Sequence, residues 1–107
     1  MSDGIPAAGR VYQHSIEGSL IPMGFAEVAA LSAGTAAALP AVPGGTRLVL
    51  LNTEVQAIRW RDDGVDPTTT SGMPLPIGEY FIYSGNPATF KMISQVASAK
   101  VSISYYR

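Results

Sequence analysis

The sequence predicts an all-β fold, a single small antiparallel β-sandwich of jelly-roll-like form or a small barrel, preceded by a mobile N-terminal arm. Short apolar or alternating segments recur along the 107 residues, and turns drawn from 11 glycines and 8 prolines separate them. No segment carries a clear apolar stripe at helical spacing. Because a chain of this length supports one core, we divide it into an arm, residues 1–18, and one sandwich domain, residues 19–107.

The composition narrows the classes of partner. The net charge is −1 and no basic run occurs, so we expect no nucleic-acid partner. The absence of cysteine fits synthesis in a reducing cytosol, and residues 1–4 lack the basic and apolar regions of a signal peptide. The alanine-rich tract 28–42 is too short and too weakly apolar to span a bilayer, so we expect no membrane partner. Only 14% of the residues are charged, against roughly 25% in average domains, and such a surface favours protein contacts.

Strand signals are weak in the first part of the chain. Residues 10–16 form at most a short strand. Within residues 20–39, alanine favours helix, but glycines and prolines divide the segment into short pieces. We therefore expect two short strands or edge segments there, followed by a Pro-Gly-Gly turn at 43–45.

The middle of the chain predicts a central strand and its partner. Residues 46–51 are a near-continuous apolar run, which is typical of a strand covered on both faces. Residues 52–54 are a short connection, and by loop length they predict a β-hairpin with the strand 55–61. Alternation along that second strand places Ile58 and Trp60 on one face and Arg59 and Arg61 on the other.

Residues 62–78 predict a structured, Ω-like excursion pinned by Met73, Leu75 and Ile77. Strands are expected again at 79–83 and 89–93, with a turn at 84–87 between them. The cleanest strand pattern is 100–107. There Val101, Ile103 and Tyr105 alternate with Lys100, Ser102, Ser104 and Tyr106, which predicts one buried and one outer face.

Residues with catalytic or metal-binding side chains do not form a recognisable motif. His14 is the only histidine and has no triad or metal spacing, so we interpret it as a surface or structural histidine. Glu27, Glu54 and Glu79 do not indicate a glycosidase pair, and we expect no enzyme activity.

Three aspartates after the second strand weakly resemble a calcium loop. Asp62 and Asp63 are adjacent, however, whereas calcium loops use alternate positions and a later acidic clamp, so we expect no metal and no cofactor. The favoured interpretation is that Asp62, Asp63 and Asp66 cap the turn and that Arg59 or Arg61 pairs with one of them. The expected structural clasp and interface therefore comprises Arg59, Trp60, Arg61, Asp62, Asp63 and Asp66.

Aromatic residues leave two interpretations open. Trp60 could be a sugar-stacking platform or a protein hot spot, but a strand tryptophan is more often packed, here under residues 73–75. The same choice applies to Tyr80, Tyr83, Tyr105 and Tyr106, with core packing favoured.

Residues 59–68 read Arg-Trp-Arg-Asp-Asp-Gly-Val-Asp-Pro-Thr, followed by Ser71-Gly72-Met73 and a terminal strand ending in Tyr-Tyr-Arg. This pattern resembles small structural proteins of tailed bacteriophages over roughly residues 30–107. The resemblance implies a β-sandwich on the virion, with capsid decoration or cement as one role. The motif does not distinguish a head protein from a tail or fibre component.

We therefore expect a non-enzymatic phage virion protein, assembled in the host cytoplasm, that docks on the major capsid protein or other virion proteins. It would be present in many copies or as a homo-oligomer, and its arm would order on assembly. The alternative is a tail or fibre module that recognises host cell-surface glycan through Trp60 and the tyrosines.

Overall fold

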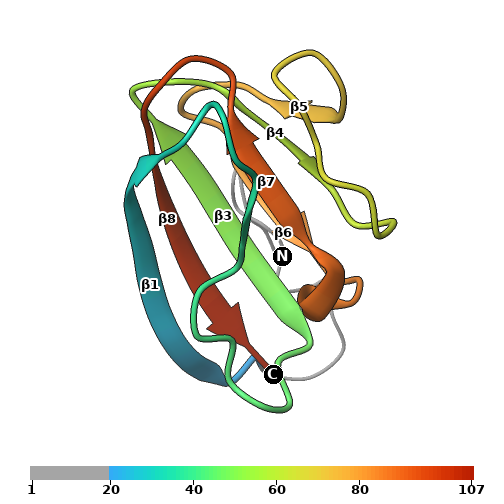
Figure 1. The fold of residues 1–107 in the computed structure, drawn as a ribbon. Helices are drawn as coiled ribbons and strands as arrows, with labels where there is room; N and C mark the ends of the chain where they lie inside the picture. The colour runs from blue at the N-terminus through green and yellow to red at the C-terminus, as the bar shows by residue number, and fades with distance from the viewer. Residues whose placement is uncertain (1–19) are drawn as a thin grey trace.

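A computed structural model describes residues 20–107, which form eight β-strands in two antiparallel sheets of four (Figure 1). The strand orders are β1-β8-β3-β6 in the first sheet and β2-β7-β4-β5 in the second. The strands are β1 (Pro22–Leu31), β2 (Ala37–Ala38), β3 (Leu48–Glu54), β4 (Ile58–Arg61), β5 (Met73–Leu75), β6 (Tyr80–Tyr83), β7 (Lys91–Ser94) and β8 (Ala99–Tyr106). A 3-10 turn, η2 (Pro87–Thr89), connects β6 to β7.

The strand pairing is that of a jelly roll. β1 pairs with β8, β2 with β7, β3 with β6 and β4 with β5, so the second half of the chain retraces the first. Two further pairings, β3 with β8 and β4 with β7, join these pairs into the two sheets. Eight strands in two facing sheets define this architecture. The sandwich prediction is confirmed, and the barrel alternative is wrong because the sheets do not close on each other.

The core lies between the sheets and is built by alternation. On β8, Val101, Ile103 and Tyr105 are buried, while the residues between them are partly exposed, as the period-2 pattern predicts. From the opposite sheet, Ile58 and Met92 are fully buried against them.

The structure corrects the prediction for β3. This strand is central, between β8 and β6, but only one of its faces is buried, because Leu48 and Leu50 are partly exposed on the outer face. The predicted hairpin with β4 is also wrong, since β3 and β4 lie in different sheets. A tight turn makes the crossing: Val55 adopts a φ of 76°, and the Gln56 N–H donates to the Glu54 carbonyl at 2.9 Å.

Edge strands account for the ambiguous first part of the chain. Two strands form within 20–39, β1 and β2, and each is at the edge of its sheet. Pro22 lies in β1 and Pro74 lies in β5. Both are edge strands, where a missing N–H does not interrupt hydrogen bonding between two neighbouring strands. Register shifts interrupt β1 at both ends, a common protection of edges against pairing with other chains.

Three sequence predictions fall on residues outside 20–107: the N-terminal arm, the short strand at 10–16 and the role of His14. Within 20–107, no helix is long and apolar enough to cross a membrane.

Candidate functional site: the loop between β4 and β5

The loop 62–72 connects two strands that are paired with each other (Figure 1). Trp60 at the end of β4 lies opposite Met73 at the start of β5, and Ile58 lies opposite Leu75. The two ends of the loop are therefore held side by side at the edge of the second sheet. Of the three apolar residues expected to pin the excursion, only Leu75 is buried, whereas Met73 and Ile77 are more than half exposed.

Arg59 fixes the far side of the loop. Its side chain points to the outer face of β4, as the alternation predicts, and reaches loop carbonyls rather than an aspartate. Nη1 donates to the Gly72 carbonyl at 2.8 Å and Nε donates to the Thr69 carbonyl at 3.2 Å. Because a guanidinium presents its donors in a fixed fork, one side chain holds two points of the loop at once.

Gly72 lets the loop pass close over β4. Its φ is +139°, in the region that favours glycine, and a Cβ there would lie 3.1 Å from the Trp60 carbonyl oxygen. The same Cβ would lie 3.2 Å from Cβ of Arg59 and of Pro67. Any larger residue would push the loop off the strand that it covers.

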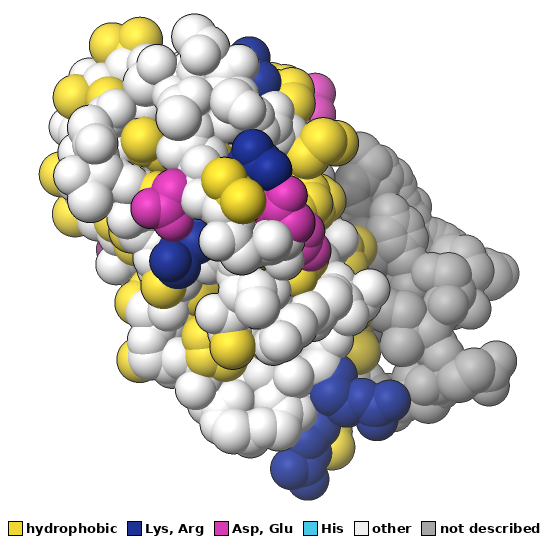
Figure 2. Space-filling model, turned by 45° about the vertical axis from the view of Figure 1, so that its right-hand side comes forward, with side chains coloured by type: hydrophobic (Ala, Val, Ile, Leu, Met, Phe, Trp, Pro, Cys, Tyr) yellow, Lys and Arg dark blue, Asp and Glu magenta, His cyan; other side chains and the backbone are white. Residues whose placement is uncertain are grey.

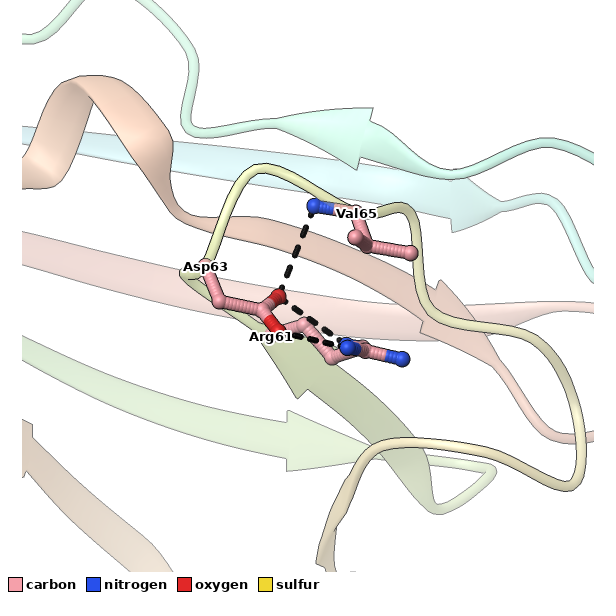
Figure 3. Close-up of polar contacts among 3 residues, drawn as sticks. All are labelled: Arg61, Asp63 and Val65. Atoms are coloured by element: carbon pink, nitrogen blue, oxygen red, sulfur yellow. Dashed lines mark hydrogen bonds and ion pairs between the residues drawn. The ribbon is translucent and has the colours of Figure 1, made fainter.

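Arg61 makes the expected arginine–aspartate pair (Figure 3). Its Nε donates to Oδ1 of Asp63 at 3.0 Å, and its Nη2 donates to Oδ2 of the same carboxylate. Oδ1 also accepts the Val65 N–H at 3.4 Å. The hydrogen bond from Arg61 lowers the pKa of Asp63 below its ordinary value, and the same bond raises the pKa of Arg61.

Asp62 joins the loop to the other sheet. Its Oδ2 accepts the hydroxyl of Tyr83, which comes from β6, at 2.8 Å. The same hydroxyl lies 3.1 Å from the Asn86 carbonyl. Burial raises the pKa of Tyr83 to about 12, and the neighbouring Asp62 carboxylate adds to the shift. The phenol therefore remains a neutral donor at physiological pH.

Asp66 and the loop tip complete the clasp. Asp66 lies 3.5 Å from Nζ of Lys91, in an exposed ion pair. Thr68 and Ser71 exchange backbone hydrogen bonds of 2.9 and 3.3 Å, and Pro67 is buried. The loop is thus folded on itself as well as fixed to its strand.

Each of the three aspartates has a different partner: Asp62 contacts Tyr83, Asp63 contacts Arg61 and Asp66 contacts Lys91. Among residues 20–107, no group of three or more histidine, cysteine or acidic side chains is placed to share a cation.

Trp60 packs between the sheets. Its ring is tilted by 30° to that of Phe81 at 4.9 Å and stacks on that of Phe90 at 5.2 Å (18°), while Tyr83 approaches edge-on at 5.8 Å. These rings come from β6 and from the residue before β7. Trp60 is therefore packed, as the favoured prediction has it, with aromatic rings from β6 and Phe90 against it, whereas Met73 of the expected cover 73–75 is 57% exposed.

A shallow depression of about 530 Å³ lies where β4 ends and β5 begins. It is lined by Trp60, Arg61, Asp62, Asp63, Ser71, Gly72 and Met73. On the face in Figure 2, acidic side chains lie beside basic ones over the middle of the surface, and basic side chains gather at its lower edge.

Sequence reasoning did not identify Tyr83, Lys91 or Gly72 as parts of the clasp. Tyr83 and Lys91 come from distant segments, and no local pattern marks them as partners of this loop. Gly72 could have been found from the sequence, because a Ser-Gly pair just before a strand indicates a backbone position that needs glycine. No known protein family, curated protein or solved structure matches this chain.

Proposed function

We propose that this chain is a non-enzymatic structural protein of a bacteriophage virion, a decoration or cement protein that docks on the major capsid lattice and stabilises the particle. The observation that carries the proposal is a jelly-roll sandwich with one long loop clasped rigidly to its framework. A rigid surface of this kind suits docking, because little side-chain or loop freedom is lost when the partner binds.

The fold supports the proposal by analogy, since jelly rolls recur in viral capsid proteins. The motif at 59–68, from which the resemblance to phage proteins was drawn, supplies the clasp itself. Arg59 and Arg61 hold the loop, and Asp62 ties it to β6. The residues that carry the resemblance are thus the residues that shape the surface.

The charges of this surface also suit a structural role. Ion pairs join Arg61 to Asp63 and Lys91 to Asp66, and on the first sheet Lys100 lies 3.6 Å from Glu27. Charges paired within the chain stabilise its own geometry and are not aimed together at a reacting group.

Capsids assembled with and without the chain test the proposal. Binding only to the assembled shell stabilises that shell by mass action, so decorated capsids should withstand higher temperature and more chelator before releasing their DNA. Adding the purified chain back to undecorated capsids is the matched control and should restore the resistance. Equal resistance with and without the chain would remove the cement role.

The glycan-binding alternative stays a prediction. It relied on Trp60 as a stacking platform, and the indole ring already packs against Phe81 and Phe90, whose ring centroids lie 4.9 and 5.2 Å away. Tyr80 is a tyrosine that the structure leaves open to solvent, at 62% exposure. A glycan array, read together with adsorption of phage carrying Tyr80→Ala, distinguishes this alternative from the cement role.

A further inference from the structure

Three connections between strands, β3–β4, β5–β6 and β7–β8, meet at one end of the sandwich (Figure 1). The Gly78 N–H, after β5, donates to the Thr53 carbonyl at 2.9 Å, and the Gln95 N–H, after β7, donates to the Ala57 carbonyl at 3.0 Å. Each connection exposes one β-branched side chain, and these are Val55, Ile77 and Val96, at 64%, 54% and 60% exposure. Because the backbone is tied and such side chains have few rotamers, this apolar end is a rigid surface.

Val55 occupies a backbone conformation that is unfavourable for its side chain. Its φ of 76° and the bond from the Gln56 N–H to the Glu54 carbonyl form a γ-turn with positive φ, which is rare and strained. Glycine and asparagine adopt positive φ readily, whereas a β-branched residue does not. Since the side chain is 64% exposed, packing inside the chain offsets little of this strain. An exposed valine in a strained turn points to a contact outside the chain.

Acidic side chains flank the apolar end. Glu54 and Glu79 lie within two residues of its apolar side chains, and both are exposed. Lys100, which lies opposite Glu54 on β8, is 3.6 Å from Glu27. Among the ion pairs formed within residues 20–107, none includes Glu54 or Glu79. The apolar end therefore favours a partner surface that is both apolar and basic.

The opposite end of the sandwich has this complementary chemistry. β3 runs from one end to the other, so Arg47 before it and Val55 after it lie at opposite ends (Figure 1). The Arg47 N–H donates to the Tyr106 carbonyl at 2.9 Å, and Arg107 exchanges two backbone hydrogen bonds of 2.9 Å with Ile21. Both arginines are exposed, and Ile21 beside them is 52% exposed. These three residues define the basic end.

Acidic residues are absent from the segments next to these arginines. Residues 20–23, 41–47 and 105–107 contain no aspartate or glutamate. On the face in Figure 2, the basic side chains at the lower edge have no acidic side chain beside them. An acidic and apolar surface from outside the chain would therefore complement the basic end.

We propose that copies of this chain associate head to tail, with the apolar end of one copy docked on the basic end of the next. Val55 contacts the apolar part around Ile21, and Glu79 faces Arg47. A second copy is the occupant because one chain carries both complementary surfaces, and a net charge of −1 causes little repulsion between copies. Such a contact is heterologous, so it builds rings or filaments. The inference concerns contacts between copies and goes beyond the proposed contact with the capsid.

The contact between two ends is small. The two shorter extents of the molecule are 28 and 22 Å, so an end of this cross-section buries less than the roughly 800 Å² per partner of a standard interface. Association should therefore be weak in free solution. It should become strong where many copies are held close together, because a high effective concentration compensates for low affinity.

Sedimentation equilibrium of the full chain over a range of protein concentrations tests the inference. The average mass should rise with concentration in roughly 50 mM NaCl and rise less in roughly 500 mM, because salt screens exposed charges. Glu79→Lys and Arg47→Glu should each lower the association constant about tenfold or more, since each places like charges opposite each other. An equimolar mixture of the two variants should restore association, because each reversed charge then meets its complement.

Val55→Asn separates the apolar contact from the stability of the fold. Asparagine suits a positive φ, so this variant should keep or raise the midpoint of thermal unfolding while associating about tenfold more weakly. Met73→Gln is the control, because Met73 is 57% exposed on the edge strand β5, and association should stay within about twofold of wild type. Circular dichroism verifies that each variant is folded.

The outcomes separate this inference from the proposed function. A chain that stays monomeric at every concentration, single variants that associate like wild type, or a mixture that stays dissociated would overturn the inference. If the wild type is monomeric and capsids bind it but not Val55→Asn, the apolar end contacts the capsid protein, and the inference fails while the capsid role stands. Association restored in the mixture, with capsids that bind no form of the chain, would support the inference and reject the capsid role.

Discussion

The hydroxyl of Tyr83 donates to Oδ2 of Asp62 at 2.8 Å and so joins the edge strand of one sheet to the loop that leaves the other. Tyr83 is only 5% exposed and packs against Trp60 and Phe90. The same residue therefore contributes to the aromatic core with its ring and to the clasp with its hydroxyl. Packing of the core and position of the loop are coupled through it.

Removing this hydroxyl should loosen the loop without disturbing the core. We expect Tyr83→Phe to lower the free energy of unfolding at pH 7 by about 1 kcal/mol, the usual net contribution of one hydrogen bond. The reduction stays small because Asp62 is exposed and water can replace the lost donor. Urea unfolding measures the change. A loss as large as that of a core truncation would contradict the assignment of the hydroxyl to the clasp alone.

The same variant should change the response to alkaline pH. The pKa of Tyr83 is raised to about 12 in the folded chain, above its ordinary value of 10.0, so folding favours the neutral phenol. This stabilisation is complete below pH 10 and is lost as the pH rises from there through about 12. Wild type should thus lose its advantage over Tyr83→Phe across that window.

Urea midpoints measured from neutral pH into the alkaline range test this convergence. Burial also raises the pKa of Tyr105, so an alkaline loss of stability persists in Tyr83→Phe. Tyr105→Phe is therefore the control that removes the second contribution. A constant difference between wild type and Tyr83→Phe across the window would show that Tyr83 titrates normally.

The alternation of apolar and polar residues was enough to predict the features that depend on a single strand. Alternation identified β8 and placed Arg59 and Trp60 on opposite faces of β4, because a strand with one buried face must alternate. It failed at the connection after β3. Loop length predicts a hairpin only if successive strands share a sheet, and here a non-glycine residue, Val55, turns the chain into the other sheet.

The clasp was only partly predictable for the same reason. The pair Arg61–Asp63 spans two residues, and it is one of the arginine–aspartate pairs that the sequence left open. The bond between Tyr83 and Asp62 depends on how the two sheets face each other, which no local pattern encodes. Trp60 was expected to be packed, but its ring partners Phe81 and Phe90 lie in distant segments, and no local pattern links them to it.

Gly85 should tolerate no side chain, because Tyr83 lies against it. A Cβ at Gly85 would lie 2.6 Å from Cζ and 2.9 Å from Cε1 of Tyr83, and the hydrogen bond to Asp62 prevents that ring from moving freely. We expect Gly85→Ala to lower the free energy of unfolding by about 1–3 kcal/mol through overpacking. Thermal unfolding measures it.

Gly44→Ala provides the control for this substitution. Nothing lies within 4 Å of a Cβ at Gly44, and its φ is not positive. We expect a neutral effect or a gain of about 0.4–1 kcal/mol from reduced freedom of the unfolded chain. Equal losses at the two positions would mean that contact with Tyr83 is not the cause.

Calcium should not stabilise the chain through the aspartates of the loop. Asp62, Asp63 and Asp66 accept from, or pair with, three different side chains, and a cation would have to break these contacts to gather them. Thermal unfolding with millimolar Ca²⁺ or with chelator should give the same midpoint. A calcium-dependent rise that disappears in Asp63→Asn would restore the calcium-loop interpretation.

Arg59 should hold the loop more strongly than Arg61, although only Arg61 pairs with an acid. Arg59 donates to the carbonyls of Thr69 and Gly72, and the second of these bonds is partly buried. We expect Arg59→Ala to lower the free energy of unfolding by about 1–3 kcal/mol, since hydrogen bonds to charged groups contribute more than neutral ones. Hydrogen exchange should also accelerate at the amides of residues 68–72.

Arg61→Ala is the matched comparison, because the Arg61–Asp63 pair is exposed and such pairs contribute little to stability. It should leave exchange at 68–72 near wild type while raising the pKa of Asp63, which the hydrogen bond from Arg61 lowers. Arg59→Lys should not rescue Arg59→Ala, since an ammonium lacks the fork that spans two carbonyls. If exchange at 68–72 accelerated in Arg61→Ala and not in Arg59→Ala, the ion pair rather than the carbonyl contacts would hold the loop in place.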